Sequence, residues 1–129
     1  MLSVTKIITF EAAHCLPSHK GKCKNLHGHQ FKLEVEIGNK HDVINDDGMI
    51  IDFGDIKEVL QQIVDDNLDH TYLNDFFAVP PTAENMVMWI VEQLQEKIGT
   101  SIRCSAYSYL TRVRIWETSN SYAEWRATA

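Results

Sequence analysis

The chain has 129 residues, of which 44% are hydrophobic, so it is long enough for one packed core and too short for two domains of ordinary size. We therefore expect one domain over residues 1–129. The net charge of −6, with lysines and arginines scattered as single residues, excludes recognition of nucleic acid or a membrane surface through bulk positive charge.

The first ten residues lack the apolar core of a secretion signal, and no later segment is long enough to cross a membrane. Both observations favour a cytoplasmic protein. The three cysteines, Cys15, Cys23 and Cys104, form an odd set without the spacing of a disulfide framework. We expect reduced thiols, with Cys15 and Cys104 in structural roles.

Hydrophobic alternation predicts two strands at the start of the chain. Over residues 2–14 the even positions are apolar, with Lys6 as the exception, and His14 ends this series. From His27 to Ile37 the odd positions are His or apolar, and the positions between them are polar or glycine. A period of two is typical of a strand with one buried face, and the two segments are expected to pair as an antiparallel hairpin.

The middle of the chain has helical periodicity. Asp52 is the predicted N-cap of a helix that buries residues between Ile56 and Val64, after a turn at 46–48. Thr82 is the predicted N-cap of a second helix, which ends at Gly99. Two closing strands are expected at about 102–110 and 112–118. This order predicts an α+β domain with a four-stranded antiparallel sheet and two helices on one face.

Three histidines lie on the predicted inward parity of the first two strands. His27 and His29 are two residues apart in one strand, so their side chains point the same way, and a hairpin would bring His14 beside them. A surface His-x-His without metal is the simpler interpretation of that pair alone. The matching parity of His14 favours a zinc site with three imidazole ligands and one open position, as in catalytic zinc centres.

Cys23 is surrounded by Lys20, Lys22 and Lys24 in a loop directly before the second strand. Nearby positive charge favours the thiolate, which can act as a base or nucleophile. An ordinary loop cysteine is the alternative. The same lysines could attract an anionic group locally.

Two further candidates contain carboxylates. Asp69 and His70 could form an acid–base pair if a turn brings their side chains together, whereas a histidine at a helix C-terminus is the alternative. Glu117 continues the inward parity of Val113 and Ile115, where another apolar residue is expected. A buried carboxylate needs a donor, either a ligand with adjacent N–H groups or an internal lysine or arginine.

Together, several motifs in order along the chain resemble the family of 6-pyruvoyl-tetrahydropterin and 6-carboxy-tetrahydropterin synthases. They are F-E-A-A-H, C-K-N-L-H-G-H, G-M-I-I-D-F, L-D-H-T-Y-L-N, P-T-A-E-N and W-E-T. The resemblance implies the tunnelling fold, in which sheets of several protomers join into a barrel of trimers or hexamers with active sites between subunits. It further implies that His14, His27 and His29 hold zinc, that Cys23 is the proton-abstracting base, that Asp69 and His70 relay protons, and that Glu117 binds the pterin ring.

Within that family, the spacing from Cys23 to His27 resembles the 6-carboxy enzymes of queuosine biosynthesis. The implied substrate is 7,8-dihydroneopterin triphosphate, and the implied products are 6-carboxytetrahydropterin, acetaldehyde and triphosphate. A 6-pyruvoyl-forming enzyme and a non-catalytic zinc- or pterin-binding protein are the alternatives. The chain departs from the family at Cys15, where arginine is common, and in its final residues, 119–125.

Overall fold

The computed structural model describes residues 1–128. In chain order, the elements are β1 (Leu2–His14), η1 (a 3₁₀ turn, Lys22–Lys24), β2 (His27–Asn39), α1 (Phe53–Asn67), β3 (Thr71–Tyr72), α2 (Leu73–Phe76), α3 (Ala83–Lys97), β4 (Ser108–Thr118) and β5 (Ser121–Arg126). The strands form one sheet in the order β3-β1-β2-β4-β5. Every neighbouring pair is antiparallel except β1 and β3. The prediction of an α+β domain is confirmed.

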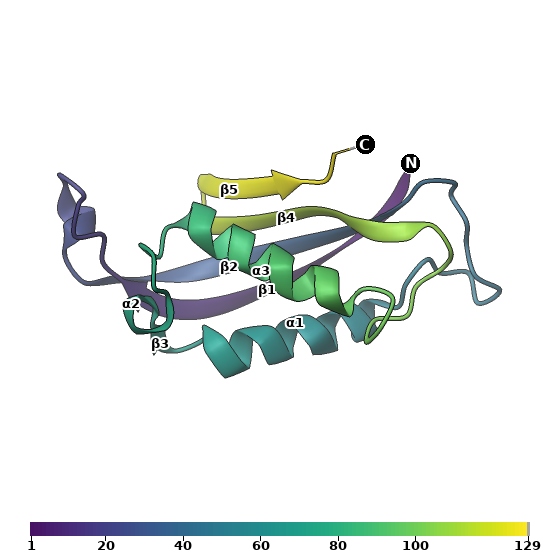
Figure 1. Ribbon diagram of the computed structural model, residues 1–129, viewed down its shortest axis with the longest axis horizontal. Coiled ribbons are helices and arrows are strands. Elements are labelled where there is room, and N and C mark those ends of the chain that lie inside the picture. The colour runs from purple at the N-terminus through teal and green to yellow at the C-terminus, as the bar shows by residue number, and fades with distance from the viewer. Residues whose placement is uncertain (129) are drawn as a thin grey trace.

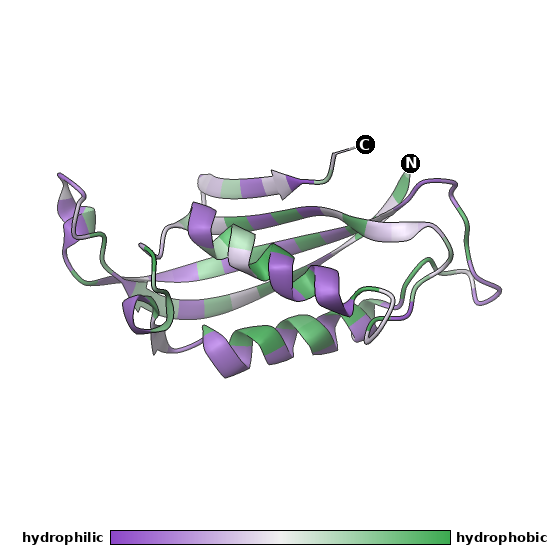
Figure 2. Cartoon of the chain, viewed as in Figure 1, coloured by the Kyte–Doolittle hydropathy of each residue, from purple (hydrophilic) through white to green (hydrophobic). Residues whose placement is uncertain are grey.

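The two long helices lie side by side on one face of the sheet (Figure 1). α1 contacts β1, whereas α3 contacts β4 and β5. We call the side covered by α1 and α3 the inner face and the opposite side the outer face. Along the strands, hydrophobic and hydrophilic residues alternate (Figure 2), which is the pattern that places Phe31 and Leu33 in the core with no exposed surface.

Both predicted helix starts are confirmed. The Asp52 carboxylate accepts a hydrogen bond from the Gly54 N–H at 2.6 Å, and the Thr82 hydroxyl accepts one from the Asn85 N–H at 3.2 Å. α3 stops just before Gly99, whose φ of +84° is the left-handed conformation that glycine adopts without strain.

The four-stranded sheet predicted from the sequence is wrong, because the closing segments divide differently. Residues 102–107 form turns and bridges, and β4 runs without a break through residue 111. Thr111 is an extra residue in β4, since Ile37 pairs with Leu110 while Glu36 pairs with Arg112. This bulge buries Leu110 and Thr111 in succession and interrupts the alternation. Two strands of the sheet were not predicted from the sequence. They are β5, near the end of the chain, and the two-residue β3.

The outer face carries charged side chains that pair with one another across strands. Arg112 and Arg114 both approach the Glu34 carboxylate, at 3.6 and 3.3 Å, and Arg114 also lies 2.7 Å from Glu124. This face therefore presents a cross-strand ion-pair network. Among residues 1–128, no helix has the length and apolar composition needed to span a membrane.

Candidate functional site

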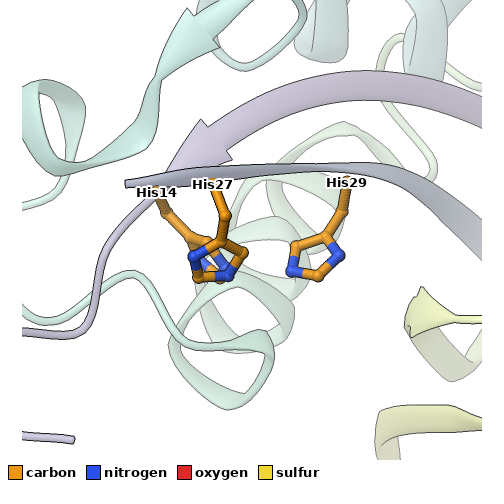
Figure 3. A group of neighbouring side chains, drawn as sticks. All are labelled: His14, His27 and His29. Atoms are coloured by element: carbon orange, nitrogen blue, oxygen red, sulfur yellow. The ribbon is translucent and has the colours of Figure 1, made fainter. Parts of the chain in front are cut away.

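The β1–β2 hairpin brings the three predicted histidines together. His14 pairs directly with His27, and Ala12 pairs with His29, so all three side chains project from the inner face at one end of the sheet. Figure 3 shows the three rings on the same side of β2. One ligand nitrogen from each histidine lies within 4.8 Å of the others. The hairpin predicted from parity is confirmed.

Each of these rings leaves a buried nitrogen without a hydrogen-bond partner. These atoms are Nε2 of His14, His27 and His29. Two of the rings are held at their other nitrogen: His14 Nδ1 lies 2.8 Å from the Pro81 carbonyl oxygen, and His27 Nδ1 lies 2.7 Å from that of Asn25. A carbonyl fixes the N–H at Nδ1 and leaves the Nε2 lone pair available, which is the usual arrangement around a metal-binding histidine. The group therefore fits a metal ion.

Glu117 lies beside this group. Its Oε1 is 3.3 Å from His14 Nε2 and 3.7 Å from His29 Nε2, and the carboxylate is partly exposed. The contact with His14 lowers the pKa of Glu117. Burial alone would lower the pKa of His14, but Glu117 and the Pro81 carbonyl outweigh it and the pKa is raised. Burial and the neighbouring imidazoles lower the pKa of His29 despite Glu117.

Asp69 and His70 are in direct contact. His70 Nδ1 lies 2.8 Å from Asp69 Oδ2, and the other Asp69 oxygen accepts the Glu11 N–H at 2.9 Å. The contact requires a turn at His70, which the sequence alone could not decide. His70 has a φ of +55°, an uncommon conformation for a residue other than glycine. The His70 N–H donates to the Glu11 carbonyl at 2.6 Å, which holds this turn against β1.

The Asp69–His70 pair and the three histidines lie on opposite faces of the sheet. Phe10 and Ala12 point inward, so Glu11 points outward, and the His70 ring lies on the Glu11 side with its Nε2 4.0 Å from the Glu11 carboxylate. A cavity of about 580 Å³ follows β1 and β2 there, with Gln30, His70 and Tyr72 in its lining. Its lining also includes His29, so the cavity reaches the histidine end of the sheet.

Cys23 belongs to a different segment of the chain from either group. It lies in η1, within the loop that extends beyond the ends of β1 and β2 (Figure 1), and its carbonyl accepts the Leu16 N–H at 2.7 Å. Within residues 1–128, no hydrogen bond joins the Cys23 thiol to the histidines, Asp69 or Glu117. Lys20, Lys22 and Lys24 are exposed on the same loop.

Sequence reasoning missed the groups that hold these side chains in place. The Pro81 and Asn25 carbonyls are backbone groups, which every residue has, so the residue type does not indicate their role. The role of Asn74, whose side-chain amide binds the N–H and the carbonyl of Cys15, was also missed. The signal that could have found it is its position at the end of the L-D-H-T-Y-L-N run that contains the acid–base pair.

Comparison with known proteins agrees with this geometry. The 6-pyruvoyl tetrahydropterin synthase family matches residues 3–128, and the chain belongs to this family. It is 32% identical to the 6-carboxy-5,6,7,8-tetrahydropterin synthase of Haemophilus influenzae, over 98% of this chain and 99% of that one. It is 40% identical to the Synechocystis protein of the same name, over 74% of this chain and 77% of that one.

The fold is also that of a solved relative. The Caenorhabditis elegans 6-pyruvoyl tetrahydropterin synthase superposes with a TM-score of 0.78 at 23% identity, covering 98% of this chain and 96% of that one. The relatives are tetrahydropterin synthases by name, which are lyases. The resemblance in the sequence motifs is thereby confirmed at the level of family and fold.

We expect the chain to bind one Zn²⁺ or Co²⁺ ion, and His29→Ala to abolish tight binding, because one of three converging nitrogens is lost. His41→Ala is the matched control, since His41 packs on Tyr107 away from the site. Metal content after gel filtration, measured by mass spectrometry, decides the matter. Full metal retention in His29→Ala would disprove the assignment.

The Asp69–His70 contact predicts a specific titration. The Asp69 carboxylate raises the pKa of His70, whereas the Glu11 N–H and then His70 lower the pKa of Asp69. The raised pKa makes a stabilising contribution that is full below the ordinary histidine pKa and is lost as pH rises through the raised value. The lowered pKa of Asp69 contributes above the ordinary carboxyl pKa and is lost as pH falls through the lowered value.

Asp69→Asn should therefore lower the pKa of His70, as followed by NMR of its imidazole protons. Asp75→Asn, which removes an exposed carboxylate a few residues further on, serves as the control. The same His70 midpoint in wild type and Asp69→Asn would show that the carboxylate does not act on the ring.

Proposed function

We propose that this chain is a zinc-dependent 6-carboxy-5,6,7,8-tetrahydropterin synthase of queuosine biosynthesis. It would convert 7,8-dihydroneopterin 3′-triphosphate and one water to 6-carboxytetrahydropterin, acetaldehyde and triphosphate. The observation that carries the proposal is the convergence of three buried imidazole nitrogens without hydrogen-bond partners. The names of its relatives support the choice of reaction.

His14, His27 and His29 would hold the zinc ion. When bound, zinc supplies Lewis-acid polarisation of the substrate's side-chain oxygens, which makes the adjacent C–H more acidic. Neutral imidazoles leave the ion its full positive charge, and a site with three protein ligands leaves a position for substrate. The backbone carbonyls at Nδ1 of His14 and His27 keep these two rings in the orientation that the site needs.

The other candidates have proton and recognition roles in this proposal. Cys23, as thiolate, removes the side-chain proton, and His70 with Asp69 donates and accepts protons as the side chain is cleaved. Glu117 accepts the N–H groups of the pterin ring. The reaction needs no hydride-carrying cofactor, because the pterin ring of the substrate is reduced as its side chain is oxidised.

The proposal requires more than one copy of the chain. Asp69 and His70 lie on the outer face, whereas the three histidines and Glu117 lie on the inner face, so one copy does not bring these groups onto the same side of its sheet. A homo-oligomer, a trimer or hexamer of joined sheets, would let one copy supply the acid–base pair to another copy's histidines. β1 has an open edge for such pairing, because β3 covers it only at Ala12 and Ala13.

The product assay is the central test. Purified, zinc-loaded protein is incubated anaerobically with 7,8-dihydroneopterin triphosphate, acetaldehyde is assayed, and the pterin is identified by mass. We expect acetaldehyde and 6-carboxytetrahydropterin in equal amounts. Triphosphate release without acetaldehyde, leaving a 6-pyruvoyl pterin, would identify the alternative synthase. Binding without turnover would favour a non-catalytic pterin-binding protein.

Cys23→Ala should abolish turnover and leave zinc and pterin binding nearly intact, because the thiolate acts on protons and does not hold the metal. Cys104→Ala is the matched control, since it removes another thiol of intermediate exposure that has no role in the proposed site. Activity is followed by triphosphate release and zinc by metal analysis. An active Cys23→Ala enzyme would assign the base to another residue.

Glu117→Gln separates two roles for this carboxylate. A pterin-binding carboxylate that becomes an amide presents an N–H to the ring's own N–H groups, so affinity for a pterin analogue should fall by about tenfold or more while zinc is retained. The proximity of Glu117 to His14 and His29 makes it a possible metal ligand instead. Loss of zinc with unchanged pterin affinity, measured by calorimetry, would favour that second role.

A further inference from the structure

The segment from Asp69 to Asn74 covers the edge of β1 at its C-terminal end. In a strand, the N–H and C=O of one residue point to the same edge, and successive residues alternate between edges. Glu11, Ala13 and Cys15 therefore turn their backbone groups toward this segment. Glu11 is bound by the Asp69 carboxylate and the His70 N–H, and β3 pairs with the next residues along.

Cys15 receives its partner from a side chain. The Cys15 N–H donates to Asn74 Oδ1 at 2.9 Å, and Asn74 Nδ2 donates to the Cys15 carbonyl at 2.9 Å. β3 has already ended at Tyr72, and the chain has turned into α2. A primary amide carries both a donor and an acceptor, so it can replace the two backbone groups that a longer strand would have provided.

A second contact joins the same two segments. Cys15 Sγ lies 3.1 Å from the Tyr72 hydroxyl, so three polar contacts converge on one residue just beyond the end of β1. The loop that leads to Cys23 begins at this point. Without these contacts, the end of β1 would have no partner on this edge, and strand ends without partners fray.

His14 is the residue directly before this anchored peptide. Its side chain is fully buried, and its ring contacts the Pro81 carbonyl on one side and the other two histidines on the other. A displacement of the Cys15 peptide would move the Cα of His14, and a buried ring cannot compensate by rotating freely in a packed core.

We propose that Asn74 is a positioning residue of the three-histidine centre: by holding the Cys15 peptide, its side-chain amide fixes where His14 presents its Nε2. This inference rests on the metal centre of the proposed function. It also means that one short segment, residues 69–74, carries the acid–base pair at one end and supports a metal ligand at the other.

The test compares Asn74→Asp and Asn74→Ala with wild type. Asn74→Asp keeps the size and the acceptor but replaces the donor facing the Cys15 carbonyl, and Asn74→Ala removes both bonds. Zinc affinity is measured by competition with a chelator, and the geometry of the centre by the visible absorption of the cobalt-loaded protein. We expect zinc affinity to fall by about tenfold, the lower end for loss of a group that orients a metal ligand, and the cobalt bands to shift.

Asn67→Asp and Asn67→Ala are the matched controls, because Asn67 is another part-buried asparagine whose amide donates to a backbone carbonyl, that of Ile63, at 2.9 Å. Thermal unfolding of every variant is recorded alongside. Loss of thermal stability with unchanged cobalt bands would give Asn74 a purely structural role and overturn the inference. So would equal affinities and spectra in wild type and Asn74 variants. A wild-type chain that binds neither ion would instead refute the metal centre itself.

Discussion

The arrangement of the site depends on one constraint, the register of β1 against β2. His14 lies opposite His27, and this pairing places the three imidazoles on the inner face. A shift of one residue in either strand would turn its histidines to the outer face, because side chains alternate with a period of two. The core resists such a shift, since the same slip would expose Phe10 or Phe31. The hydrophobic core and the arrangement of the three histidines are therefore specified by the same alternation.

Burying these three rings together has an energetic cost. Three buried imidazole nitrogens have no hydrogen-bond partner, and a buried polar atom without a partner is destabilising by roughly 1–3 kcal/mol. The Glu117 carboxylate lies near two of these nitrogens, and it can accept a hydrogen bond from His14 Nε2 only when that ring is protonated. A bound cation would satisfy all three nitrogens at once. Three converging nitrogens of this kind could hold a metal ion.

Sequence reasoning succeeded where the local pattern also determines the tertiary contact. Alternation defined β1 and β2, and cap residues defined the starts of α1 and α3. It failed at the Thr111 bulge, because an extra residue in one strand depends on its partner's register and breaks the alternation that identifies strands. It could not decide the Asp69–His70 contact either, since that contact needs a left-handed backbone at His70, which is stabilised by hydrogen bonds to Glu11, a residue far away in the sequence.

In a single chain, the candidate site residues are divided between the two faces of the sheet. The three histidine rings and Glu117 occupy the inner face, and the His70–Asp69 pair occupies the outer face beside an open cavity. His14 belongs to β1, and Glu11 of the same strand binds the Asp69 carboxylate and the His70 N–H, so the two groups cannot come to one side without breaking these contacts. If both groups act on one substrate, as we propose, a rearrangement within the chain would dismantle the site. Association of copies would keep every strand paired, and the open edge of β1 provides backbone groups through which a second sheet could join.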